Sequence, residues 1–238
     1  GSLALAGTAQ AQASQCVTPL HSFAYTGAIE TYTVPSTGDY WIEAAGAEGG
    51  KATNSYLGPG RGATVGGKFQ LTAGTVLRVL VGQQAPLTTS GAYAGWGNGG
   101  GGGSFVTLAA ASLPNDQPLL VAGGGAGSGQ VDNANKHGQA GLAGGAGSAN
   151  GGAGGTAGSG GAQPSAGSYT SGAGGGFLGD GANNNPITTG HTANGGQAFV
   201  NGGAGGTSSN HAPGGFGGGG AGTGVGTGGG GGYSGGGA

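Results

Sequence analysis

The sequence contains very little charge, and this scarcity limits the partners that it can bind. Lys and Arg account for five of the 238 residues, Asp and Glu for seven, and the formal net charge is −2. The five cations are scattered: Lys51, Arg61, Lys68, Arg78 and Lys136. Nucleic-acid binding requires clustered cations that displace counterions from phosphates, and attachment to anionic lipid requires a polybasic cluster. We therefore expect no nucleic-acid partner and no polybasic membrane contact.

Cysteine, methionine and long apolar runs are scarce or missing. Cys16 is the sole cysteine, so the chain cannot form an internal disulfide. It is either an incidental N-terminal residue or an inter-subunit contact made through a disulfide between two chains. No run of about 18 apolar residues occurs, so the sequence predicts no transmembrane segment. Methionine is absent, and we expect the chain to derive from a longer precursor.

Residue patterns typical of catalysis or metal binding are also missing. The four histidines have no Cys or carboxylate at ligand spacing: His21, His137, His191 and His211. No G-x-S-x-G motif stands between a strand and a helix, and no phosphate-binding G-x-x-x-x-G-K-[ST] motif occurs. Glu43 and Glu48 flank a predicted strand end, where we expect them to be solvated. The sequence therefore predicts no catalytic residue, cofactor-binding residue or metal ligand, and it does not indicate an enzyme.

The first residues are typical of an exported protein. A short apolar run, LALAG at 3–7, is followed by the A-x-A pattern at 11–13, as at the end of a secretory signal peptide. We interpret 1–13 as a signal-peptide remnant and 14–22 as an N-terminal extension, which places the protein outside the cell or on its surface. The alternative is a flexible Ala/Gln-rich leader without a targeting role.

Glycine dominates what the chain does contain. The sequence has 70 Gly and 9 Pro, and such a composition favours a disordered, low-complexity chain. Disordered chains, however, usually carry a high net charge, which this chain lacks. Because the chain has little charge and few large side chains, we expect an ordered structure in which backbone packs against backbone.

The first half, 23–122, has the pattern of short β-strands separated by turns. The run at 76–81 places Leu77, Val79 and Val81 on one face and Arg78 on the other. No segment shows the apolar spacing of an α-helix. The expected strands lie at 23–25, 29–34, 40–45, 67–71, 76–81, 104–108 and 118–122. This pattern predicts a mainly β protein with an antiparallel β-sandwich.

The second half, 123–238, consists mostly of small residues, and glycine recurs there at every third position. The clearest runs are Gly141, Gly144 and Gly147; Gly152, Gly155, Gly158 and Gly161; and Gly226, Gly229, Gly232 and Gly235. Period three is that of the polyproline II helix, whose glycine edge lets neighbouring helices approach and pair their backbones. A flexible linker is the alternative, and periodicity alone does not decide between the two.

Several motifs, taken in order, resemble the glycine-rich domain of the anaplastic lymphoma kinase and leukocyte tyrosine kinase receptor ectodomains. They are GAEGGK at 46–51, GGKF at 66–69, LRVLVGQQ at 77–84, GNGGGGGSFV at 97–106, PLLVAGGG at 118–125, GGFGGGG at 214–220 and GGGGGYSG at 228–235. The resemblance covers about residue 29 to the end. It implies a β-sandwich fused to a bundle of packed glycine-rich polyproline II helices, with 23–238 forming one composite domain.

The chain departs from that family in three ways. It has none of the receptors' disulfide cysteines, it has neither a membrane span nor a kinase, and it stops before the family's last short strand. Cytokine binding is therefore not carried over. The missing strand is either a truncation or leaves a sheet edge that another chain completes, and for the second case 1–20 is a candidate donor.

These features favour a secreted, non-enzymatic structural protein, a subunit of a surface fibre, sheath or matrix that self-associates into a homopolymer. The alternative is an adhesin that binds a surface glycan through loops at 83–95 and 179–193. Ice binding is a third hypothesis, which the bulky interruptions disfavour. Five aromatic residues stand alone in the glycine-rich half, as anchors to the sheet or as exposed sugar contacts: Tyr169, Phe177, Phe199, Phe216 and Tyr233.

Overall fold

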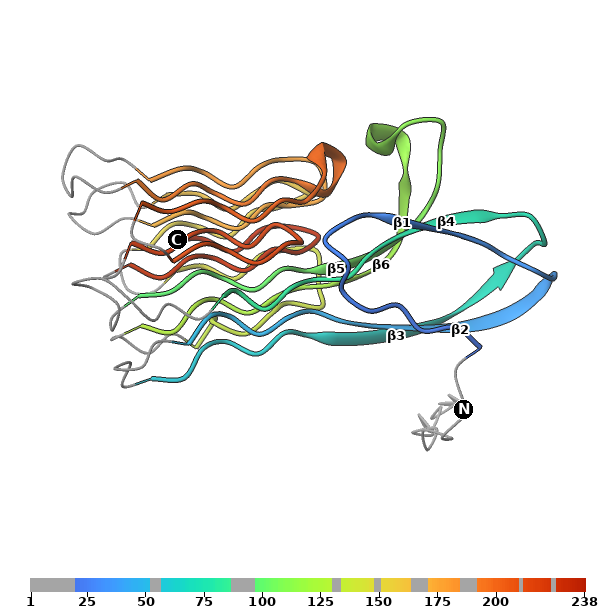
Figure 1. The fold of residues 1–238 in the computed structure, drawn as a ribbon, viewed down its shortest axis with the longest axis horizontal. Coiled ribbons are helices and arrows are strands. Elements are labelled where there is room, and N and C mark those ends of the chain that lie inside the picture. Colours follow the sequence, from blue (N-terminus) through green and yellow to red (C-terminus); the bar gives the residue numbers. More distant parts are fainter. Residues whose placement is uncertain are drawn as a thin grey trace, which may run out of the picture.

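The computed structural model describes residues 20–51, 57–86, 97–129, 134–147, 151–163, 171–184, 192–209, 212–223 and 226–238. In these ranges the chain forms six β-strands and two single-turn 3₁₀ helices, and it contains no α-helix. Figure 1 shows the strands at one end of the molecule and a stack of extended segments at the other. The prediction of a mainly β protein with antiparallel sheets is confirmed.

The strands form two antiparallel sheets. They are β1 (Glu30–Thr33), β2 (Gly38–Ala45), β3 (Thr64–Leu71), β4 (Val76–Leu80), β5 (Ser104–Leu108) and β6 (Gln117–Ala122). One sheet has the order β1-β4-β5-β6, and the other is the β2–β3 hairpin. Six of the seven expected strands are present. The strand expected at 23–25 is wrong: Phe23 packs its ring against Tyr32, with 5.9 Å between ring centroids, but its backbone joins no ladder.

The two sheets enclose an apolar core in a sandwich-like arrangement. Leu77 and Val79 of β4 are buried in it, as the alternation of 76–81 predicts, and Val81 packs against it. Along β2 and β3 every second residue points inward, so that Tyr40, Ile42 and Phe69 cover the four-stranded sheet. Alternation with period two thus buries one face of the β2–β3 hairpin and leaves the other to solvent. Strand β5 of the other sheet is buried on both faces.

An ion pair that no sequence pattern predicts lies beneath the 3₁₀ turn η1 (Leu113–Asn115). The carboxylate of Asp116 is fully buried and accepts hydrogen bonds from Arg78 Nη1, from Thr107 Oγ1 at 2.8 Å and from the Ala110 N–H at 2.8 Å. Arg78 also donates to the Ala110 carbonyl at 3.1 Å. Together these bonds fix the segment between β5 and β6 against β4.

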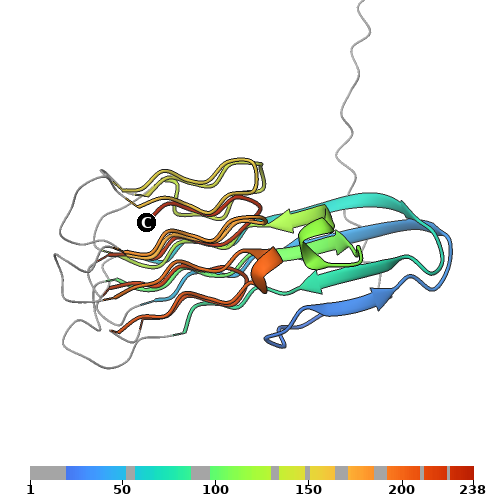
Figure 2. The ribbon, with the colours of Figure 1, turned by 90° about the horizontal axis from the view of Figure 1, so that it is seen from above.

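The rest of the molecule is a bundle of extended glycine-rich segments held together by backbone hydrogen bonds. The bonds join residues far apart in sequence: the Gly100 N–H donates to Gly220 O at 2.9 Å, and the Gly124 N–H donates to Gly231 O at 2.7 Å. These segments carry no strand assignment. Viewed from above in Figure 2, they lie side by side in successive layers. The described segments of the glycine-rich half are therefore ordered, while their polyproline II conformation stays a prediction.

The bundle also recruits glycine runs from the first half, so the boundary expected between residues 122 and 123 does not separate the two parts in space. Ala47, directly after β2, donates to Gly102 O at 2.9 Å, and Gly102 lies just before β5. Gly231, near the chain end, donates to Gly101 O at 3.0 Å. Each hairpin of the sandwich thus extends into the bundle, because a glycine run follows or precedes the strand.

Glycine is required at the contacts between these segments. A Cβ atom on Gly102 would lie 1.7 Å from Phe216 O, and one on Gly60 would lie 1.8 Å from Lys136 O. Both obstacles are backbone atoms, which cannot move aside as a flexible side chain can. By contrast, a Cβ on Gly58 would meet nothing within 4 Å. Backbone therefore packs directly on backbone, and the glycines make this close approach possible.

An aromatic cluster joins the bundle to the sandwich. Phe105 of β5 stacks on Phe199, which opens the 3₁₀ turn η2 (Phe199–Asn201), with 5.1 Å between ring centroids. Phe199 stacks in turn on Phe177 at 5.2 Å, and Leu80 of β4 completes the buried cluster. The interpretation of Phe177 and Phe199 as anchors between bundle and sheet is confirmed. Tyr169 lies outside the described residues.

Candidate functional site

The single cysteine and most of the N-terminal segment cannot be placed. Cys16, the signal-peptide remnant 1–13 and residues 14–19 of the extension lie outside the described residues. The described remainder of the extension begins at Leu20, which is exposed. Inter-subunit contact through Cys16 and strand donation by 1–20 therefore stay predictions.

The two described histidines take part in separate local contacts. His21 packs edge-on against Phe23 with a centroid distance of 4.5 Å, whereas Nδ1 of His137 accepts the Arg61 N–H at 3.1 Å. His191 and His211 lie outside the described ranges. Within these ranges no group of three or more His, Cys, Asp and Glu residues is placed to hold a metal ion.

Glu43 and Glu48 are both exposed, as expected for solvated carboxylates. A carboxylate oxygen of Glu48 lies 3.4 Å from Nε2 of Gln84, so this side chain bridges two segments of the bundle at its surface. Glu43 lies on the outer face of β2.

The two loops expected to bind a partner are shorter than the sequence indicated. The Gln83 N–H donates to Phe216 O at 2.8 Å, which makes 83–86 part of the bundle. Oδ1 of Asp180 accepts the Ala198 N–H at 2.7 Å and Nδ2 of Asn201 at 2.8 Å, so 179–184 is likewise bonded to its neighbours. What remains of the two loops is 87–95 and 185–191, which lie outside the described residues.

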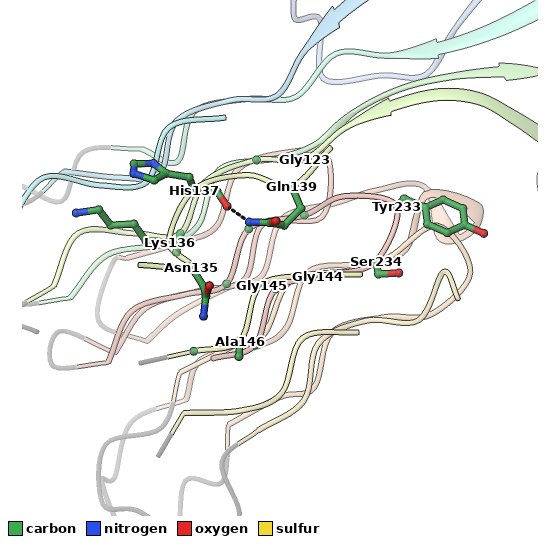
Figure 3. Close-up of a pocket in the computed structure, with 18 of the residues that line it drawn as sticks. Gly123, Asn135, Lys136, His137, Gln139, Gly144, Gly145, Ala146, Tyr233 and Ser234 are labelled. Atoms are coloured by element: carbon green, nitrogen blue, oxygen red, sulfur yellow. Dashed lines mark hydrogen bonds between the residues drawn. The ribbon is translucent and has the colours of Figure 1, made fainter. Parts of the chain in front are cut away.

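A shallow groove with a volume of about 30 Å³ runs along the bundle, lined mainly by glycine. Its side chains bind nearby backbone: Nε2 of Gln139 donates to His137 O at 2.7 Å, and Oγ of Ser234 donates to Leu142 O at 2.6 Å. In Figure 3 the labelled side chains are spread along the groove and do not gather at one point. The groove therefore offers backbone contacts, and it does not present the set of converging polar groups that a small-molecule site uses.

The open edge of β1 is the feature best suited to binding another chain. β1 pairs with β4 on one side only. The Val34 N–H donates to Thr75 O at 2.8 Å, and bonding alternates along an antiparallel pair. In the register Thr33↔Val76 and Thr31↔Arg78, the N–H and C=O groups of Thr31 and Thr33 therefore point away from β4. No described residue pairs with them.

The opposite edge of the same sheet is protected. β6 contains Pro118, which has no N–H to offer, and its pairing with β5 is interrupted by an irregularity at Val106/Thr107. Directly after β6, the Gly123 carbonyl accepts the Ala63 N–H at 2.8 Å, which ties this edge to the other sheet. Proline, bulges and covering segments are common protections of sheet edges, so β1 is the more open of the two edges.

Comparison with known proteins finds no match for this chain, either among protein-family models or among curated proteins. The resemblance to the receptor glycine-rich domain thus stays a prediction. In the part of the chain that the structure describes, no helix has the length and apolar character that crossing a membrane requires.

Proposed function

We propose that this protein is a non-enzymatic extracellular structural subunit that assembles with copies of itself through the open edge of β1. The observation that carries the proposal is the pair of threonines, Thr31 and Thr33, whose backbone groups face outward without a described partner. Strand addition to such an edge supplies main-chain hydrogen bonds to a partner of almost any sequence. Residues 1–20 are the proposed donor, since they precede the sandwich in the sequence; after cleavage of a signal peptide, 14–20 would be the part that remains to donate.

The bundle supports a mechanical role in this proposal. Its segments are cross-linked by backbone bonds such as the one from Gly220 N–H to Gly229 O at 2.8 Å, and their contacts leave no room for a side chain. Close packing of this kind transmits force with little deformation. A rigid body with an open strand edge at its sandwich end is suited to repetition in a fibre, sheath or matrix.

The test is assembly of the full chain measured by negative-stain electron microscopy and analytical ultracentrifugation. We expect filaments or large oligomers from the unaltered protein, and loss of assembly when 1–20 is deleted. Thr33→Pro removes one outward N–H while leaving the ladder to β4 intact, so it should also abolish assembly. Thr33→Ala keeps the N–H and is the matched control. Monomers at every concentration, or Thr33→Pro assembling as Thr33→Ala does, would reject the proposal.

An adhesin that binds a surface glycan is the second candidate. Several described segments, among them 83–86 and 179–184, end at the pole of the bundle remote from the sandwich (Figure 1). In the sequence they are followed by 87–95, which includes Tyr93, and by 185–191. If the protein stays monomeric, we expect it to bind cells or immobilised glycans, and replacement of 87–95 by a Gly/Ser segment of equal length to remove that binding.

Export is proposed together with either function. It is supported by the apolar run and A-x-A pattern at 3–13. N-terminal sequencing of the protein from its native source tests it: a mature chain that begins at Ser14 supports cleavage, and one that still contains Leu3 contradicts it.

A further inference from the structure

The outer face of the β2–β3 hairpin carries the one tryptophan that the structure describes. Outward-facing residues alternate along both strands and are exposed: Asp39, Trp41, Glu43, Ala45, Thr64, Gly66, Lys68 and Gln70. Trp41 is 68% exposed, and it is the most exposed of the described aromatic side chains. Because the inner face of the hairpin already packs on the core, this tryptophan contributes nothing to the burial that holds the sandwich together.

The ring of Trp41 is held close to the sheet by a glycine. A Cβ atom on Gly66 would lie 2.9 Å from Cζ2 and 3.3 Å from Cε2 of the indole. Gly66 pairs with Glu43 across the hairpin, one step diagonal from Trp41. An aromatic ring that covers a strand glycine shields the exposed backbone and is supported by it. The indole thus rests on the hairpin as a supported platform.

Hydrogen-bonding groups surround this platform. Lys68, the cross-strand partner of Trp41, extends to Asp39, with 2.8 Å between Nζ and Oδ2. Glu43 follows Trp41 on the same face, and Gln70 lies opposite Asp39. Two carboxylates, one ammonium group and one amide give the face many donors and acceptors around a single apolar centre, with a net charge of about −1.

The size of the face decides what kind of partner it fits. Two strands of eight residues cover about 26 Å by 10 Å, whereas a stable protein interface buries about 800 Å² on each side and has an apolar centre of several residues. One indole ringed by polar groups falls well short of that. It does match a pyranose, whose C–H face stacks on an aromatic ring while its hydroxyls bond to carboxylate and amide groups.

We propose that the outer face of β2–β3 is a carbohydrate-binding platform on which Trp41 stacks against a neutral β-linked pyranose chain. Equatorial hydroxyls leave such a sugar with flat C–H faces, and Asp39 and Glu43 repel acidic polysaccharides. This surface is separate from the open edge of β1 and from the pole of the bundle at which 83–86 and 179–184 end. The inference is therefore independent of assembly through β1, and it differs from glycan binding by the loops because sugar binding at Trp41 should survive replacement of 87–95.

Isothermal titration of the full chain with cellohexaose, chitohexaose and laminarihexaose, and with polygalacturonate as the acidic comparison, tests the platform. We expect a dissociation constant of roughly 1 mM or tighter for at least one neutral oligosaccharide and none for the acidic polymer. Trp41→Ala should weaken binding at least about tenfold. Tyr25→Ala, which removes another exposed aromatic ring away from β2–β3, is the matched control and should leave binding unchanged.

Gly66→Ala separates a binding role from a structural one. The added methyl group must displace the Trp41 ring, but it improves the strand propensity of the position, so binding should weaken about three- to tenfold without a fall in melting temperature. In a Trp96→Phe background the emission of Trp41 should shift on saturation with sugar. The platform is rejected if no neutral sugar binds, if Trp41→Ala binds as the unaltered chain does, or if Trp41→Ala changes self-association instead.

Discussion

At the scale of the residue, glycine plays two different roles that the sequence does not distinguish. Gly102 stands where a Cβ would overlap Phe216 O, whereas Gly58 faces open space, although both occur in glycine-rich stretches. The difference depends on which backbone segment lies opposite each glycine. For Gly102 that segment contains Phe216, which is more than a hundred residues away in the sequence. The abundance of glycine therefore predicts that glycines are needed for packing, but not which of them are.

Substituting these two glycines by alanine tests this distinction. Gly102→Ala forces two backbones apart, and we expect the free energy of unfolding to fall by about 3 kcal/mol or more. Gly58→Ala introduces the same methyl group into open space and should change it by less than about 0.5 kcal/mol. Urea unfolding followed by circular dichroism measures both. Equal effects for the two variants would show that the backbone contacts do not limit stability.

At the scale of the element, the segment between β5 and β6 is fixed by a buried ion pair between Arg78 and Asp116. Arg78 of β4 stands on the face opposite Leu77 and Val79, as its alternation predicts. Its partner Asp116, however, is 38 residues away. Arg78 and Asp116 come together because the β4–β5 register pairs Arg78 with Thr107, whose hydroxyl also bonds to Asp116. The alternation could place the arginine on the outer face but could not identify its acid.

Removing the buried charge of Asp116 should be far more costly than removing an exposed one. Asp116→Asn leaves the guanidinium of Arg78, whose side chain is 19% exposed, without its counter-charge. We expect a loss of about 3 kcal/mol. Asp39→Asn breaks the exposed pair with Lys68 and should cost less than about 1 kcal/mol. Thermal unfolding of both variants at pH 7 gives the comparison, and similar melting temperatures would contradict it.

At the scale of the whole molecule, the sandwich and the bundle share their interior. Each glycine run of the first half continues a strand into the bundle, and the stacked rings of Phe105, Phe177 and Phe199 connect the two at their junction. The Gly231 N–H donates a hydrogen bond to Gly101 O, so residues separated by more than half of the sequence are joined directly. If either part unfolds, the other part therefore loses backbone hydrogen bonds and aromatic contacts.

One cooperative unfolding transition is the expected consequence, as predicted for a composite domain of 23–238. Urea unfolding followed in the near ultraviolet, which reports the aromatic junction, and in the far ultraviolet, which reports the backbone, should give coincident midpoints. Phe199→Ala should lower both midpoints together, because it empties the stacked cluster. Two separated transitions, or a shift in only one signal, would show that the sandwich and the bundle unfold as independent units.

The sequence by itself determined the positions of six strands, the absence of α-helix from the described residues, and the use of glycine to pack backbone on backbone. These features depend on local alternation, turn residues and composition, which neighbouring residues specify. Only the tertiary structure decided the rest: the strand order that leaves β1 open, the assignment of glycine runs from the first half to the bundle, the pairing of Arg78 with Asp116, and the exposure of Trp41. Each of these depends on contacts between segments distant in the chain. Such contacts are fixed by register and by which face each element buries, and no local pattern records them.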